Sequence, residues 1–383
     1  MQFSSHLLHS PVIRRLDHKT FVSQRVAAIL DNQRQLVAQA LGQLAAAESV
    51  QIPLTTVSLD SNFDAYINIG FRGGRGQTLT PLVVDSGNSN LIVPSWEDIA
   101  ALPNSGKNYT ILGAGKEPWG SPANIVRGPI EIPTASGHMY SLENCVFYAC
   151  TGDPRTANFG AGCLLPWSAN AWNTPGGIGI TMQAPLSYNS AYPFALLSYA
   201  PAENILLNIA GPHVTTGSSL LLHKTAPVGY FMLDIVPNLE WMSVIPKFLG
   251  IGNTVTAWPG TVNSPVAMVD TGGGPVFLSD LNGYVYNSVW PAGTACPTWT
   301  SESTDCQCTG APIKIELSDG NTSISYVIDP NRLPPAVRGL TLVMCKINSY
   351  MWDQQGMNIG GISALFNSIL IDYLNSRVGF KSK

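Results

Sequence analysis

The chain has 383 residues, of which 45% are hydrophobic and 11% are charged. A chain of this size and apolar content can bury a large core, which argues against a disordered or fibrous protein. The net charge of −4 indicates no basic surface for a polyanion, so we expect no nucleic-acid partner. No apolar run reaches about 18 residues, so we expect no membrane span. The 36 Gly and 28 Pro favour short strands joined by tight turns, and therefore an all-β fold.

The first 48 residues differ from the rest of the chain, because they carry five basic and three acidic side chains. Between residues 21 and 47, apolar residues recur at three- and four-residue steps, which predicts one or two amphipathic helices. A basic helical segment of this kind complements a more acidic body. The first 20 residues lack the apolar run of a secretory signal, which favours an intracellular location.

Seven cysteines form two groups along the chain. Short-range pairs such as Cys145 with Cys150 would suit disulfide bonds in an oxidising compartment, and buried free thiols are the alternative. The odd number leaves at least one cysteine unpaired. The two indications of compartment therefore disagree.

The most informative feature is an approximate internal repeat. Segments 81–93 and 265–278 both read as an apolar strand, Asp, a small hydroxyl residue, Gly, a polar turn and a second apolar strand. One Asp-Ser/Thr-Gly sequence alone is usually only a turn. Two copies with matching flanks, containing Asp85 and Asp270, favour a functional pair carried by a duplicated β lobe.

The position of the repeat also predicts the domain organisation. We expect a helical segment over residues 1–50, an N-terminal β lobe over 51–212 and a C-terminal β lobe over 213–383. Each lobe would then contribute one of the two Asp residues.

At this point the chain resembles the pepsin-like aspartic proteases, and the resemblance runs from about residue 59 to residue 380. The similar segments, in chain order, are 66–70, 84–94, 229–235, 269–272, 358–361 and 369–380. This resemblance implies a bilobal double β-barrel with a central cleft. It also implies that Asp85 and Asp270 are the catalytic residues, with neighbouring loop residues in support. These supporting residues are Ser86, Gly87, Asn88, Thr271, Gly272 and Gly273.

The resemblance assigns a role to each part of the two loops. Two adjacent carboxylates share one proton, so that one activates a water molecule and the other hydrogen-bonds the scissile carbonyl. Ser86 and Thr271 would brace the two loops through hydrogen bonds to backbone. A β-hairpin flap would cover the cleft, with Trp119, Gly120 and Ser121 at its tip.

Several positions depart from the family pattern. The family usually has Tyr where Trp119 stands and Trp where Ile92 stands. Asn88 and Gly273 occupy places where Ser or Thr commonly donates to the outer oxygen of each Asp. Because Gly273 has no side chain to donate, we expect the pKa of Asp270 to be raised.

The leading interpretation is an aspartic endopeptidase that binds an extended peptide as a monomer, with no cofactor or metal. Pockets lined by Trp119, Ile111 and Val276 would favour large apolar side chains. The helical segment would be the propeptide of a zymogen, or an extension that stays packed on the body. The family resemblance implies a secreted or vacuolar location, and Cys306 or Cys308 would pair with Cys345.

Two alternatives remain open. In the first, a protein of this fold uses the Asp pair as acid and base on a small molecule, as an isomerase, cyclase or dehydratase. In the second, which both retained Asp residues disfavour, the protein binds a ligand without catalysis. The sequence contains no His-Glu-x-x-His, Gly-x-Ser-x-Gly or phosphate-binding Gly-Lys-Ser/Thr motif, which argues against the main rival hydrolase and nucleotide-binding classes.

Overall fold

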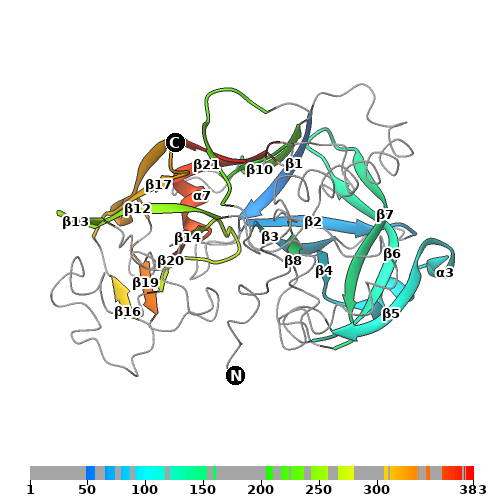
Figure 1. The fold of residues 1–383 in the computed structure, drawn as a ribbon. Coiled ribbons are helices and arrows are strands. Elements are labelled where there is room, and N and C mark those ends of the chain that lie inside the picture. Colours follow the sequence, from blue (N-terminus) through cyan, green and yellow to red (C-terminus); the bar gives the residue numbers. More distant parts are fainter. Residues whose placement is uncertain are drawn as a thin grey trace, which may run out of the picture.

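A computed structural model describes the chain over a set of separate ranges. These are residues 49–56, 65–73, 79–86, 91–116, 121–152, 158–160, 204–209, 217–223, 226–236, 243–257, 266–279, 306–308, 311–333, 335, 342–345, 356–372, 375 and 377–383. The helical segment predicted before residue 49 lies outside these ranges. Within them the fold is mostly β, with two mixed sheets and a few short helices, which confirms the prediction of a strand-rich chain (Figure 1).

The larger sheet has 13 described strands and contains strands from both halves of the sequence. Its strands, in spatial order, are β11 (Phe231–Asp234), β22 (Arg377–Ser382), β21 (Asn367–Asp372), β9 (Asn204–Asn208), β10 (Ser219–His223), β1 (Ser49–Thr56), β2 (Ala65–Phe71), β3 (Thr80–Asp85), β8 (Asn158–Gly160), β4 (Leu91–Val93), β7 (Met139–Cys150), β6 (Pro122–Pro133) and β5 (Thr110–Lys116). β2 also pairs with β6.

The second sheet lies within the C-terminal half of the chain. Its strands, in spatial order, are β16 (Cys306–Cys308), β19 (Leu342–Cys345), β15 (Val276–Ser279), β20 (Gly356–Asn358), β14 (Val266–Met268), β12 (Ser243–Ile251), β17 (Ile313–Ser318) and β18 (Ser323–Ile328), and β13 (Thr254–Ala257) pairs with β12. The described helices are α2 (Trp96–Ala100), α3 (Ser105–Asn108), the 3-10 helix η5 (Pro330–Arg332) and α7 (Ile362–Phe366). None of them is long and apolar enough to cross a membrane.

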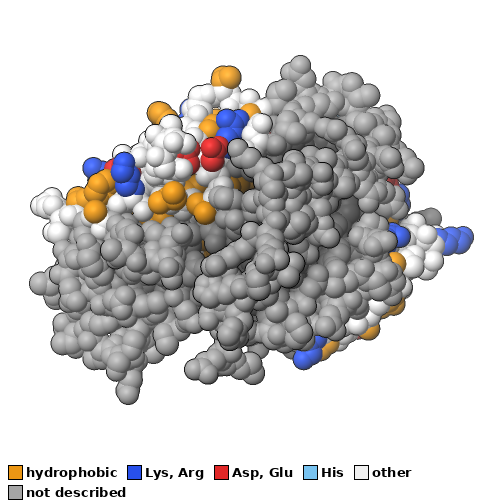
Figure 2. All heavy atoms as spheres, in the orientation of Figure 1, with side chains coloured by type: hydrophobic (Ala, Val, Ile, Leu, Met, Phe, Trp, Pro, Cys, Tyr) orange, Lys and Arg blue, Asp and Glu red, His pale blue; other side chains and the backbone are white. Residues whose placement is uncertain are grey.

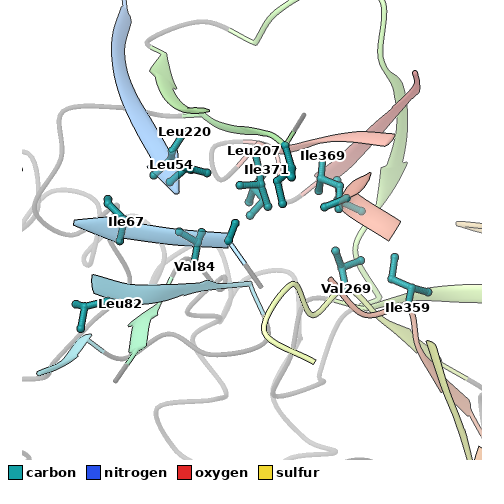
Figure 3. Packing of buried hydrophobic residues seen from close by; sticks show 14 of the residues in the cluster. Leu54, Ile67, Leu82, Val84, Leu207, Leu220, Val269, Ile359, Ile369 and Ile371 are labelled. Carbon is teal, nitrogen blue, oxygen red and sulfur yellow. The ribbon is translucent and has the colours of Figure 1, made fainter. Parts of the chain in front are cut away.

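The strands form because apolar residues alternate with polar ones, which matches the period of two in a strand. In β18, Ile324, Tyr326 and Ile328 are buried while the residues between them are exposed. Buried side chains from both sheets join in one hydrophobic cluster. Figure 3 shows Val84 and Ile67 of the larger sheet on the left of this cluster, and Val269 and Ile359 on its right. On the face in Figure 2, hydrophobic groups of described residues lie beside basic ones at the end of the molecule that carries β13.

β1 connects two parts of the larger sheet, because it pairs with β10 on one side and β2 on the other. It begins at Ser49, which lies opposite His223. The segment 1–50 predicted from the sequence therefore overlaps this strand by Ser49 and Val50.

The strands around the two Asp residues have the same connections in both halves. In the larger sheet, β8 pairs in parallel with β3 and antiparallel with β4. In the second sheet, β20 pairs in parallel with β14 and antiparallel with β15. The turn with Asp85 thus connects β3 to β4, and β8 lies between these two strands in the sheet. The turn with Asp270 connects β14 to β15, and β20 lies between them. The sequence repeat corresponds to a repeat of local topology.

Cys145 and Cys150 are buried free thiols, which is the second of the two alternatives predicted for this pair, and no disulfide joins them. They lie five residues apart on β7, and a strand rises about 3.3 Å per residue, so their Cα atoms are separated by far more than the 7 Å limit of a disulfide. β16 pairs with β19 and places Cys306 opposite Met344, next in sequence to Cys345. A bond between Cys306 or Cys308 and Cys345 stays a prediction.

Candidate active site

The two Asp residues of the sequence repeat occupy equivalent positions at the ends of strands. Asp85 is the last residue of β3, and Asp270 follows β14 by two residues. Each side chain is about nine-tenths buried, since the residues are 7% exposed. The apolar residues before each Asp anchor the turns in the core, with Val84 at 1% and Val269 at 0% exposure.

Four buried hydrogen bonds join the two turns reciprocally. The Ser86 hydroxyl donates to the Val269 carbonyl at 2.8 Å and accepts from the Thr271 N–H at 3.0 Å. The Thr271 hydroxyl donates to the Val84 carbonyl at 2.7 Å and accepts from the Ser86 N–H at 3.0 Å. Each hydroxyl therefore satisfies one buried donor and one buried acceptor of the opposite turn. Residues 185 positions apart are held together in this way.

The close approach of the turns requires glycine at position 272. A Cβ atom on Gly272 would lie 2.6 Å from Cγ of Asp85 and 2.9 Å from its Oδ2, which is shorter than real Cβ contacts. The backbone N–H of Gly272 also donates to Oδ1 of Asp270 at 3.0 Å. Gly272 therefore contacts both carboxyl groups, and only a residue without a side chain fits between them.

The electrostatics of this arrangement favour a shared proton. The pKa of Asp270 is raised well above its usual value, first by burial and then by the negative charge and hydrogen bonding of Asp85. Two carboxyl groups so close together cannot both ionise without a large cost. The protonated form of Asp270 is therefore favoured in this arrangement.

Asn358, on β20, is a member of this site that the sequence analysis missed. Its Nδ2 donates to Oδ2 of Asp270 at 2.5 Å, and Asn358 is 1% exposed. The expectation that Asp270 lacks a side-chain donor because of Gly273 is therefore wrong. The raised pKa of Asp270 comes from burial and Asp85, whereas Asn358 lowers it.

A sequence signal for Asn358 did exist. The segment Asn158-Phe-Gly160 repeats as Asn358-Ile-Gly360. Asn158 is the first residue of β8 and Asn358 the last of β20, and each of these strands lies between the two strands around one Asp. A match of three residues does not by itself predict a shared role for the two asparagines. The strand register supports that role, and the sequence does not reveal the register.

The remaining predicted site residues fall into two groups. Gly87, Asn88, Trp119 and Gly120 lie outside the described residues. Ser121 is described, immediately before β6, and is 6% exposed.

Of the residues predicted to line substrate pockets, Val276 does not do so. Its exposure is 0%, and it belongs to the hydrophobic core. Ile111 is 48% exposed on β5, whereas Trp119 lies outside the described residues. Strand β15 faces the core at position 276, which explains why an apolar residue stands there.

Within the described ranges, no group of three or more His, Cys, Asp or Glu side chains is arranged to hold a metal ion. The geometry offers two carboxyl groups, backbone N–H donors and one amide. Such a set of groups can accept and donate protons.

Neither a comparison with protein-family models nor a search of curated proteins finds a match for this chain. The resemblance to the pepsin-like aspartic proteases therefore stays a prediction from the sequence motifs.

Proposed function

We propose that this chain is an aspartic endopeptidase, in which Asp85 and Asp270 share one proton and activate a water molecule. The observation that carries the proposal is the convergence of two Asp-Ser/Thr-Gly turns, locked by reciprocal hydrogen bonds, on a pair of buried carboxyl groups. A structural role alone would not require two carboxyl groups at this cost in burial, because an unpaired buried charge is expensive.

The chemistry follows from the shared proton. The ionised carboxylate takes a proton from water, and the resulting oxygen nucleophile attacks the peptide carbonyl carbon. The protonated carboxyl group gives its proton to the carbonyl oxygen, which produces a tetrahedral gem-diol. The carboxyl group that took the proton from water passes it to the nitrogen, and the carbon–nitrogen bond breaks while the other carboxylate takes a proton from one gem-diol hydroxyl. The products are a carboxylic acid and an amine, and the pair returns to its singly protonated form.

The proposal includes the arrangement of the chain in two β-barrel lobes. We infer a bilobal double β-barrel with the Asp pair in a central cleft, over residues 51–212 and 213–383. The shared connections of β3, β8 and β4 with those of β14, β20 and β15 support two equivalent lobes. The pairing of β2 with β6 supports closure of the first lobe, because these strands lie at the ends of one run of neighbouring strands.

Cleavage of an acid-denatured protein at about pH 4 tests this function. We expect cleavage by the wild type and a loss of at least about 10³-fold in Asp85→Asn and in Asp270→Asn. Asp329→Asn is the matched control, because Asp329 caps η5 through the Asn331 N–H at 2.9 Å. Full cleavage in either active-site variant would overturn the proposal.

Intact mass after incubation at about pH 4 separates a zymogen from the alternatives. Loss of roughly the first 50 residues, blocked by Asp85→Asn, is expected if residues 1–50 are a propeptide. An intact chain that cleaves no protein would instead favour acid–base chemistry on a small molecule by the same Asp pair.

A further inference from the structure

The amide of Asn358 is held in one orientation by its surroundings. Its Oδ1 accepts the backbone N–H of Gly360 at 2.8 Å, so the oxygen must lie on that side. The Nδ2 group is then directed to Oδ2 of Asp270. This assignment matters because the oxygen and nitrogen of an amide are told apart by their hydrogen-bond partners.

The backbone around Asn358 is also tightly fixed. β20 lies between β14 and β15, with Asn358 opposite Met268 on one side and Phe277 on the other. The N–H of Ile359 donates to the Met268 carbonyl at 3.0 Å. The amide therefore stands on a rigid part of the sheet.

Gly273 shows that the amide takes up space that a side chain would otherwise fill. A Cβ atom at position 273 would lie 2.7 Å from Nδ2 of Asn358 and 2.8 Å from Oδ2 of Asp270. Asn358 therefore fits beside Asp270 only because position 273 has no side chain.

The first half of the chain repeats the same register. Asn158 pairs with Val83, two residues before Asp85, just as Asn358 pairs with Met268, two residues before Asp270. On its other side Asn158 pairs with Ile92, which lies seven residues after Asp85. Asn358 likewise pairs with Phe277, which lies seven residues after Asp270. The backbone places both asparagines at equivalent positions.

We propose that Asn358 is a positioning residue for the Asp pair, which holds the outer carboxyl oxygen of Asp270 in place of a hydroxyl side chain at position 273, and that Asn158 stands at the matching place beside Asp85. The proposal rests on the proposed function for its catalytic meaning. The physical effect on Asp270 does not depend on which reaction the pair performs.

The expected effect follows from the groups around Asp270. The influences on its carboxyl group are burial, Asp85, the Asn358 amide and the Gly272 N–H. Burial and Asp85 favour the protonated form, and the two N–H donors favour the ionised form. Removal of the amide should therefore raise the pKa of Asp270. A hydrogen bond to a charged group corresponds to a shift of about 1 to 2 pH units.

The test compares Asn358→Leu and Asn358→Ala with the wild type in two measurements. The first is the titration of the Asp carboxyl carbons by NMR, in protein labelled with ¹³C at Asp. The second is the pH profile of protein cleavage. We expect the titration of the pair to move upward by about 1 unit or more in both variants, and the alkaline limb of the activity profile to move with it.

Asn367→Leu is the matched control. Asn367 is also 1% exposed and donates one hydrogen bond, from its Nδ2 to the Ser363 carbonyl at 3.2 Å. Its loss should reduce stability by a similar mechanism without moving the titration of the Asp pair. If Asn358→Leu does not fold, Asn358→Ala, which removes the same amide and adds no bulk, carries the same comparison.

A rescue experiment separates positioning from simple packing. Gly273→Ser alone should lower cleavage because its side chain meets Asn358. In Asn358→Ala the contacts with Asn358 are gone, and the Asp270 carboxyl can move into the space to relieve its own 2.8 Å contact with the new Cβ. Gly273→Ser then supplies a hydroxyl to Asp270 and should restore the titration toward that of the wild type.

The outcomes distinguish the two proposals. Unshifted titration in both Asn358 variants, like that of Asn367→Leu, would overturn the role of Asn358 even if the chain cleaves protein. A shifted titration in a chain without protease activity would support Asn358 while overturning the proposed function. Asn158→Leu extends the test, and we expect it to change the titration of the pair as well.

Discussion

The reciprocal hydrogen bonds of Ser86 predict a large loss of stability when this one hydroxyl is removed. Ser86→Ala leaves the Val269 carbonyl and the Thr271 N–H without their partner, in a position where Ser86 is 2% exposed. Each unsatisfied buried group costs about 1 to 3 kcal/mol. We therefore expect the free energy of unfolding to fall by about 2 to 5 kcal/mol, and cleavage activity to fall because the turns lose their alignment.

Ser318→Ala is the control for this substitution. The Ser318 hydroxyl also makes one donor and one acceptor bond, to the Thr322 carbonyl at 2.6 Å and from the Gly320 N–H at 2.9 Å. Gly320 and Thr322 are exposed at the turn between β17 and β18, so water can replace the lost bonds. The expected cost is about 1 kcal/mol or less.

Guanidinium unfolding followed by tryptophan fluorescence measures both variants. The reasoning would be refuted if Ser86→Ala were no less stable than Ser318→Ala. Thr271→Val tests the other half of the arrangement, because it leaves the Val84 carbonyl and the Ser86 N–H unpaired. Since both changes open the same contact between turns, the double variant should lose less than the sum of the two single losses.

Three further predictions follow from the described residues. Because the pKa of Asp270 is raised above 3.8 in the folded protein, the stability that its protonation contributes is complete below that pH and is lost as pH rises through the folded-state pKa. The melting temperature of Asp270→Asn minus that of the wild type should therefore rise between about pH 4 and pH 7, and a constant difference would contradict this. Gly272→Ala places a Cβ 2.6 Å from Cγ of Asp85 and should lower kcat/KM about 100-fold, whereas Gly106→Ala, with no atom within 4 Å of its Cβ, should leave it unchanged. Burial raises the pKa of the Cys145 thiol, so a thiol reagent at about pH 8 should modify Cys145 only after unfolding, and equal rates in folded and unfolded protein would disprove its burial.

Local patterns were sufficient to predict the strands and the two Asp turns. Alternating apolar residues specify a strand, as in β18, and an Asp-Ser/Thr-Gly sequence after an apolar run specifies a turn. Burial and backbone hydrogen bonding act over a few neighbouring residues in these cases. The repeat around Asp85 and Asp270 could therefore be recognised without knowledge of the three-dimensional arrangement.

The open and mistaken points concern how the strands extend and which way they face. A disulfide between Cys145 and Cys150 is excluded because β7 is extended over both positions. Val276 was predicted to line a pocket, but a residue's apolar character does not reveal which side of a strand faces the core.

Asn358 shows most directly what only the tertiary structure decides. It lies 88 residues after Asp270, and nothing in its immediate sequence indicates that its amide donates to that carboxyl group. The contact exists because β20 pairs with both β14 and β15, which brings Asn358 beside the Asp turn. The sequence by itself determined a strand-rich chain with two matching Asp turns. The hydrogen bonds between the two turns decided their convergence, and strand pairing decided the partner of Asp270, because both depend on the packing of residues far apart in sequence.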